Sequence, residues 1–199
     1  MQEKQTKLYI LLIRSNSILS RLIYKVTKAE YTHASIGVSE DCRKLYSFAR
    51  KYTYMPLPAG FVMEGIDHGL MGKTPKAPCA LYEISVSNEA YENINNHLSG
   101  MLQQSWKYRY RLFGLIQCYF KLEYESREHF FCSQFVAYIL TLYGVIQPTK
   151  HVSLYQPMDF TCQPELKLRY KGTLGELIRL NQNKGIHYCT NSSPSTSIS

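Results

Sequence analysis

The chain has 199 residues, 45% of them hydrophobic and 19% charged, which is enough for one hydrophobic core and short for two domains. Its net charge of +8 makes nucleic acid and an anionic membrane surface the partners to weigh first. The basic residues are scattered apart from the short cluster Lys107, Arg109 and Arg111, and no nucleic-acid-binding motif occurs. We therefore predict no nucleic-acid partner and only weak support for a membrane surface.

The six cysteines, at positions 42, 79, 118, 132, 162 and 189, show no short paired spacing. Neither a zinc site nor a disulfide framework is therefore expected, and no cofactor is predicted. The start of the chain has an apolar run of only a few residues, interrupted by Arg14, which predicts a strand rather than a signal peptide. No apolar run reaches the length of a membrane span, so we predict a cytoplasmic protein with reduced thiols.

The first predicted elements are a strand and a helix. Residues 7–14 form a continuous apolar run with β-branched and aromatic members, which is typical of a central strand. Residues 17–29 follow as a helix, with Ser15 or Asn16 as the N-cap and apolar residues recurring on one face.

A hairpin is predicted next. Residues 31–38 alternate, so that His33 and Ser35 point to one face of the strand and their neighbours point to the other. Residues 44–50 return as a second strand after a turn at residues 39–43, which makes the two strands an antiparallel pair.

A long loop, a strand and a helix occupy the middle of the chain. Residues 51–76 are rich in Pro, Gly and Tyr and predict a loop, with a short strand at about Gly60–Met63. Residues 79–87 are predicted to form another strand. Asn88 is the expected N-cap of a helix that runs to about Gln104, with acidic residues favourably placed in its first turns.

The C-terminal part of the chain changes from patterned to polar sequence. The pattern indicates a helical turn within residues 153–160, an edge strand over 165–172 and a last helical turn or two over 174–180. The composition becomes polar from about residue 181, which predicts a disordered tail over 181–199. Residues 1–180 are accordingly expected to form a single domain.

Residues 129–143 contain a cysteine at the start of an apolar helix. Apolar residues recur through this stretch at helical spacing and predict a buried helix, with Cys132 in its first turn. The first backbone N–H groups of a helix lack internal partners, and the positive end of its dipole lies there, so a thiol at this place ionises more easily. We interpret Cys132 as a candidate nucleophile; a buried core cysteine is the alternative interpretation.

His33 is the candidate proton carrier. Histidine is the usual general base near neutral pH, and a strand histidine paired with a cysteine at a helix start is a known way to activate a thiol. The small residue Gly37 on the same face is expected to leave space above the sheet. A strand histidine with no catalytic role is the alternative interpretation.

Two motifs of the chain resemble those of the permuted papain-like fold. Residues 32–36 read THASI and residues 131–136 read FCSQFV, about a hundred residues apart and with the histidine before the cysteine. They are most similar to the YiiX/YaeF-like group of bacterial hydrolases, circularly permuted relatives of the NlpC-type peptidases. This group shares its arrangement with lecithin:retinol acyltransferase. The tyrosine-rich segment 107–114 also resembles a stretch that the family has before its cysteine helix, so the likeness covers about residues 7–146.

The resemblance implies an α+β fold in which a small antiparallel sheet packs against the helix that carries the nucleophile. It also implies a thiol hydrolase. Cys132 would attack an amide or ester carbonyl, His33 would accept the thiol proton and deliver it to the leaving group, and water would resolve the acyl-thioester. The backbone N–H of Cys132 is expected to stabilise the oxyanion. A small peptide, another amide or a lipid ester all remain open as substrates.

A third residue that orients the histidine is implied on the strand after it, where Ser47 stands. A three-residue turn at residues 40–42 would place Ser47 on the face of His33, whereas a two-residue turn would point Ser47 away. We therefore predict Cys132, His33 and Ser47 as the catalytic residues, with Glu64 of the following loop as the alternative to Ser47.

Two other functions remain open at this stage. An acyltransferase of the lecithin:retinol acyltransferase type would use the same cysteine, and the basic, aromatic residues 106–120, predicted as a short helix and a connection, are its only candidate membrane segment. A binding module that keeps the fold without catalysis is the second alternative, because serine is an uncharged orienting residue. The sequence does not indicate an oligomeric state.

Overall fold

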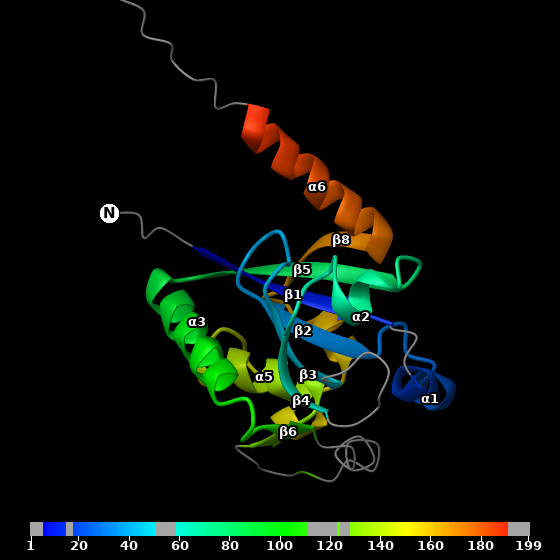
Figure 1. Ribbon diagram of the computed structural model, residues 1–199. Helices are drawn as coiled ribbons and strands as arrows, with labels where there is room; N and C mark the ends of the chain where they lie inside the picture. The colour runs from blue at the N-terminus through cyan, green and yellow to red at the C-terminus, as the bar shows by residue number, and fades with distance from the viewer. Residues whose placement is uncertain (1–5, 15–17, 51–58, 111–122, 124–127, 191–199) are drawn as a thin grey trace, which may run out of the picture.

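The computed structural model of the protein describes residues 6–14, 18–50, 59–110, 123 and 128–190. Within these residues, helices combine with a large sheet in an α+β arrangement (Figure 1). The predicted class is therefore confirmed at this level. The sheet is much larger than the small one expected, because short strands from both halves of the chain extend it.

The described strands form an eight-stranded sheet in the order β7-β6-β4-β3-β2-β1-β5-β8. Neighbouring strands run antiparallel, except for β6 and β7, which are parallel. The order places β8 at one edge, as the sequence predicts for an edge strand. The strands are β1 (Thr6–Ile13), β2 (His33–Gly37), β3 (Leu45–Arg50), β4 (Ala59–Glu64), β5 (Pro78–Val86), β6 (Arg109–Tyr110), β7 (His129–Phe130) and β8 (Lys167–Thr173).

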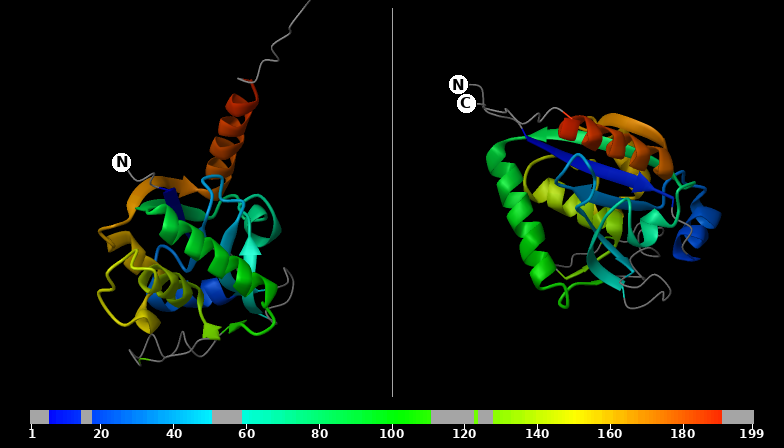
Figure 2. Two further views of the ribbon diagram at one scale, coloured as in Figure 1. Left: turned by 90° about the vertical axis from the view of Figure 1, so that its left-hand side faces the viewer. Right: turned by 45° about the horizontal axis from the view of Figure 1, so that its top comes forward.

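Helices cover both faces of this sheet (Figure 1, Figure 2). Residues of α3 and α5 belong to the hydrophobic core on one face, and residues of α2 and α6 belong to the core on the other. The helices are α1 (Ile18–Thr27), α2 (Gly69–Gly72), α3 (Asn88–Gln103), α5 (Cys132–Leu142) and α6 (Leu174–Thr190), with the 3₁₀ turns η1 (Val152–Leu154) and η2 (Pro157–Cys162).

Strand β1 is buried on both faces, which explains why its sequence is a continuous apolar run. Leu8, Ile10 and Leu12 belong to the core shared with α3 and α5. Tyr9 and Leu11 belong to the core shared with α2 and α6. Since β2 and β5 both pair with β1, its side chains link the two cores through the middle of the sheet.

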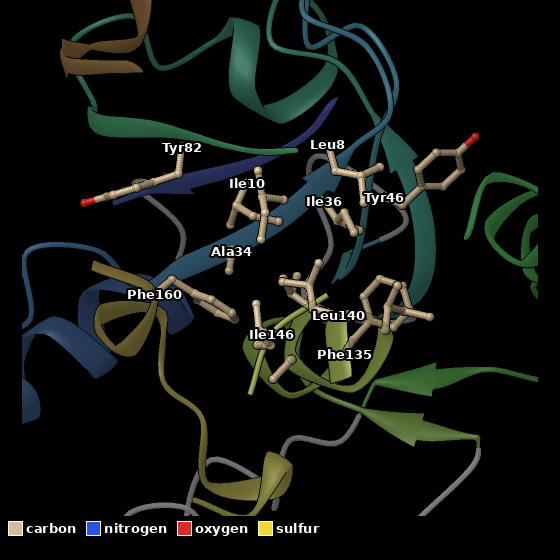
Figure 3. Close-up of a cluster of buried hydrophobic side chains, with 14 of the residues drawn as sticks. Leu8, Ile10, Ala34, Ile36, Tyr46, Tyr82, Phe135, Leu140, Ile146 and Phe160 are labelled. Carbon is tan, nitrogen blue, oxygen red and sulfur yellow. The ribbon is translucent and has the colours of Figure 1, made fainter. Parts of the chain in front are cut away.

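Aromatic rings hold α5 against the sheet. Phe48 of β3 and Phe61 of β4 lie 5.6 Å apart between ring centroids. The ring of Phe135 of α5 is 5.3 Å from that of Phe48 and 5.2 Å from that of Phe61. Figure 3 shows Ala34 and Ile36 of β2 pointing from the sheet toward this helix. The packing fixes the N-terminal turn of α5 beside β2 and β3.

Helix α6 is longer than the sequence predicts. A turn or two over residues 174–180 was expected before a disordered tail, but the helix continues to Thr190. Leu174 and Leu177 anchor its start in the core. The side-chain amide of Asn181 donates a hydrogen bond of 3.0 Å to the backbone oxygen of Asp41. Polar sequence therefore continues a helix that is already held at its N-terminal end, and residues 191–199 lie outside the described residues.

The remaining differences from prediction are local. Ser87, and not Asn88, is the N-cap of α3, and its side chain accepts a 3.1 Å hydrogen bond from the backbone N–H of Ala90. The short helix α2 lies within the stretch predicted as a loop. The proposed N-caps of α1, Ser15 and Asn16, and most of the expected helix over 106–120 lie outside the described residues. No helix of the described part has the length and apolar character needed to cross a membrane.

The packing of α5 gives a direct stability prediction. Leu140 is fully buried in the core, whereas Leu142 on the same helix is 51% exposed. Leu140→Ala should lower the free energy of unfolding by about 2–5 kcal/mol, because it removes buried methyl groups and leaves a cavity. Leu142→Ala, the matched control, should change it by about 0.5 kcal/mol or less. Urea denaturation of both variants tests this, and equal effects would contradict the packing.

Candidate active site

The site lies where β2 and β3 separate. The two strands pair only at Ile36 with Tyr46 and at Gly37 with Leu45. Toward His33, strand β2 continues to pair with β1, whereas β3 continues to pair with β4. The separation leaves backbone groups of β2 without a strand partner on the side of β3. The N-terminal turn of α5 occupies this position.

The sulfur of Cys132 has several hydrogen-bond partners at this point. It interacts with the side chain of His33 and accepts hydrogen bonds from the backbone N–H groups of Ala34 and Ser133. Burial alone raises the pKa of the Cys132 thiol, but the positive charge and hydrogen bond of His33, together with the two N–H groups, lower it below the ordinary value of 9.0. These neighbours therefore shift the Cys132 side chain toward its thiolate form.

The first turn of α5 is itself held in place by its polar side chain. Ser133 is buried, and its hydroxyl donates a 2.8 Å hydrogen bond to the backbone oxygen of Tyr155, just after η1. Phe131 is the N-cap of the helix, with an extended backbone and no side-chain capping bond. No capping side chain therefore competes for the first N–H groups of α5, and that of Ser133 donates to the Cys132 sulfur.

His33 is in contact with a carboxylate on its other side. Its Nε2 atom lies 3.4 Å from Oε1 of Glu64 and 3.3 Å from Oγ of Ser35. Burial lowers the pKa of His33, but the negative charges of Cys132 and Glu64 outweigh burial and raise it well above the ordinary value of 6.5. The imidazolium and the Cys132 thiolate stabilise each other as an ion pair.

Ser47 lies behind Glu64. Its hydroxyl donates a hydrogen bond to Oε1 of Glu64, the same oxygen that faces His33. Burial raises the pKa of Glu64, but His33 and the Ser47 hydroxyl lower it below its ordinary value, so the carboxylate is ionised. The hydrogen bonds thus form a chain from Ser47 through Glu64 and His33 to Cys132.

The structure brings together all four residues that the sequence singled out, in a different order from the one predicted. The pairs Ile36–Tyr46 and Gly37–Leu45 have the register that the three-residue turn requires, so by strand alternation Ser47 is on the face of His33. Glu64, the alternative, contacts the imidazole, and Ser47 contacts Glu64. The space expected above Gly37 is filled, because a Cβ there would lie 2.9 Å from the Leu45 side chain.

Glu64 was expected in the loop because the short strand predicted within residues 51–76 ended at about Met63, one residue earlier. The structure confirms this strand and extends it to Glu64 as β4, in which Gly60, Val62 and Glu64 face the same side as Ser47. Two-residue alternation over residues 60–64 is the signal that could have assigned Glu64 to this face.

Tyr110 is a residue near the site that sequence reasoning did not single out. It lies on β6, and the parallel pairing of Tyr110 with Phe130 places it beside the segment that leads into Cys132. Burial and the nearby Cys132 thiolate raise the pKa of Tyr110 well above its ordinary value of 10.0. Its hydroxyl therefore stays protonated and can donate a hydrogen bond close to the sulfur.

The other described cysteines differ from Cys132. Cys42, Cys79 and Cys162 are reduced thiols, and burial together with the charge of Glu176 raises the pKa of Cys79 to about 12. Cys118 lies outside the described residues. Within the described part of the chain, no three side chains of His, Cys, Asp or Glu are grouped so as to hold a metal ion.

No protein-family model, no curated protein and no solved structure matches this chain. Its own geometry is therefore the support for a function. That geometry is a thiol with a lowered pKa at a helix N-terminus, a histidine with a raised pKa beside it and an ionised carboxylate in contact with the same imidazole ring.

The ion pair predicts the pH dependence of alkylation at Cys132. A lowered thiol pKa means that the reactive thiolate persists at lower pH, so the midpoint of the iodoacetamide rate profile should lie below 9.0. In His33→Ala the imidazolium is lost and burial dominates, so the midpoint should rise. Mass spectrometry read site by site provides the measurement. Cys162, which is exposed, is the internal control and should not respond to the substitution; a shift of both cysteines together would contradict the pairing.

The contact between Glu64 and His33 predicts a second titration effect. Glu64→Gln removes the negative charge that raises the pKa of His33, so the imidazolium should lose its proton at lower pH than in the unmodified protein. Ser47→Ala should act in the same direction and more weakly, since it changes only one partner of the carboxylate. NMR of the imidazole nitrogens across pH measures both effects. Glu92→Gln, at an exposed position of α3, is the control. An unchanged His33 titration in Glu64→Gln would refute the interaction.

Proposed function

We propose that the chain is a cysteine hydrolase of the permuted papain-like type, acting on an amide or ester bond. The single observation that supports this most is the hydrogen-bonded contact of Cys132 with His33, with Glu64 on the other side of the ring. A thiolate, a general acid–base and an orienting carboxylate in this sequence form a nucleophilic triad. We assign the catalytic roles to Cys132, His33 and Glu64, and a supporting role to Ser47.

The first chemical step is acylation of Cys132. The thiolate attacks the carbonyl carbon, a carbon–sulfur bond forms, and the carbonyl oxygen becomes an oxyanion. The N–H of Cys132 at the first helical position has no partner within the helix and is the expected donor to this oxyanion, with the Tyr110 hydroxyl as a second donor. The bond to the leaving group then breaks as the His33 imidazolium gives that group its proton, which leaves an acyl-thioester.

The second step is deacylation by water. Neutral His33 takes a proton from a water molecule, whose oxygen attacks the thioester carbonyl. The carbon–sulfur bond breaks, the carboxylic acid leaves, and the thiolate–imidazolium pair is restored. Because Nε2 of His33 faces Glu64, we assign the proton exchanges with sulfur, leaving group and water to Nδ1. Glu64 fixes this orientation and stabilises the imidazolium that recurs in the cycle.

The alternatives differ from this proposal in specific ways. An acyltransferase of the lecithin:retinol acyltransferase type would use the same acylation step and replace water with another acceptor. A binding module without catalysis was motivated by the uncharged Ser47, and an ionised Glu64 in contact with His33 argues against it. A small peptide, another amide or a lipid ester remain the substrate classes. Free cysteines fit our proposed location, the cytoplasm with reduced thiols.

Trapping the acyl-enzyme tests the proposed function. Incubation with p-nitrophenyl acetate should release nitrophenol and add one acetyl group to Cys132, seen by mass spectrometry after an acid quench. Cys132→Ala should abolish both signals, and His33→Ala should slow turnover by about 10²–10⁴-fold. Cys162→Ala, which removes an exposed thiol, should behave like the unmodified protein. Acetyl groups spread over all cysteines, or none at Cys132, would refute the proposal.

A further inference from the structure

Helix α1 presents a row of positive charges to solvent. Arg21 and Lys25 are spaced at i and i+4, which places them on one face of the helix, and Lys28 directly follows the last residue of α1; all three side chains are exposed. Ser20, at a different angle around the helix, is 3% exposed, so the helix turns another face toward the protein. We refer to Arg21, Lys25 and Lys28 as the α1 stripe.

An aromatic ring lies next to this stripe. Tyr24 is 39% exposed, the guanidinium of Arg14 lies 4.6 Å from the centre of its ring, and the amine of Lys28 lies 5.8 Å from it. The Tyr24 ring therefore contacts one cation from the segment before α1 and one from the residue that follows the helix. The result is a compact surface of cations around one exposed aromatic side chain.

The backbone at Lys28 favours glycine rather than lysine. Lys28 follows the last residue of α1 and has a φ of 54°, in the left-handed region. Glycine adopts this conformation freely, whereas other residues do so at a cost in free energy. The chain nevertheless has a lysine here, and its amine extends over Tyr24. A role for the charge would explain a lysine at a position where the backbone disfavours it.

The charges of the α1 stripe are not neutralised by ion pairs. In the described part of the chain, cations on other elements pair with carboxylates: Lys7 and Arg169 with Glu83, Lys150 with Asp159, and Lys171 with Glu30. No described carboxylate lies within ion-pair distance of Arg21, Lys25 or Lys28. The stripe is therefore an uncompensated local charge as well as part of the net +8.

The stripe lies on a convex helix close to the catalytic residues. The hydroxyls of Ser20 and Thr32 are 2.6 Å apart, which ties α1 to the residue that precedes His33. Both Figure 1 and the right-hand view of Figure 2 show α1 at one side of the molecule, outside the sheet. A helix at the side of the molecule can lie flat on an extended surface.

We propose that the α1 stripe docks the protein on an anionic membrane surface, with Tyr24 at the level of the lipid headgroups. Three unpaired cations and an adjacent tyrosine have the chemistry that binds anionic lipid surfaces. The cations would contact lipid phosphates, and the docked orientation would bring the end of β2 that carries His33 toward the membrane. This inference goes beyond the hydrolase activity and does not depend on it.

Vesicle sedimentation tests the proposal with the full chain. The protein should co-sediment with vesicles that contain phosphatidylglycerol and not with pure phosphatidylcholine vesicles, and high salt should release it. A triple variant with Arg21→Gln, Lys25→Gln and Lys28→Gln should bind about a hundredfold more weakly. The matched control replaces three exposed cations elsewhere in the chain with Gln: Lys44, Lys76 and Arg179. It removes the same charge and should retain most of the binding.

A single variant separates binding from folding. Lys28→Gly removes one charge and relieves the left-handed backbone, so it should leave the thermal midpoint equal or higher and weaken vesicle binding by about fivefold. Cys132→Ala should bind vesicles like the unmodified protein, so a failed hydrolase test and a failed binding test can be told apart. If both triple variants lost vesicle binding equally, the net charge of the protein and not the α1 stripe would explain the binding, and the proposal would be overturned. Binding to soluble polyglutamate but not to anionic vesicles would overturn it in favour of an acidic protein partner.

Discussion

The separation of β2 from β3 is the constraint on which the site depends. If the two strands paired along their whole length, the N–H of Ala34 would bond to β3 and no place would remain for the first turn of α5. The Phe48, Phe61 and Phe135 rings hold the helix so that this turn sits at the opening. The Cys132 sulfur then accepts the hydrogen bond from Ala34 that a strand neighbour would otherwise accept. A break in the sheet thus supplies part of the stabilisation of the thiolate.

The three buried ionisable groups of the site stabilise one another's charged forms. Burial disfavours the charged forms of Cys132, His33 and Glu64. In each case the charges and hydrogen bonds of the neighbouring groups outweigh burial and shift the pKa toward the charged form. Removing one member of such a group leaves another charge buried without its partner, which costs more than the pair contributes to stability. The arrangement therefore contributes little to folding. Its chemical consequence is a Cys132 thiol whose pKa is lowered by its neighbours, and the packing around the site maintains this effect.

The resemblance of two short motifs to a known family singled out Cys132 and His33, local patterns predicted the elements that carry them, and long-range pairing supplied what the patterns lacked. Alternation around His33 and helical spacing after Cys132 each depend on a few neighbouring residues, and both predictions held for the structure. The sequence left the length of the hairpin turn open between two and three residues, and the pairing of β2 with β3 has the register of the three-residue turn. The contact of Glu64 with His33 required the predicted strand at about Gly60–Met63 to extend by one residue and to pair with β3. The position of Tyr110 required the pairing of β6 with β7, segments about twenty residues apart whose adjacency no local periodicity encodes.

Local contacts, and not the surface charge of α1, dominate the electrostatics of the site. Besides burial, the groups that shift the pKa values of Cys132 and His33 most are direct neighbours: His33 and the N–H groups of Ala34 and Ser133 act on the thiol, and Cys132 and Glu64 act on the imidazole. Helix α1 is tied to the start of β2 through the hydroxyls of Ser20 and Thr32, outside that set of groups. Short-range hydrogen bonds are much less sensitive to screening than a long-range field is. Docking of the α1 stripe on an anionic surface would therefore leave the lowered pKa of the Cys132 thiol largely unchanged.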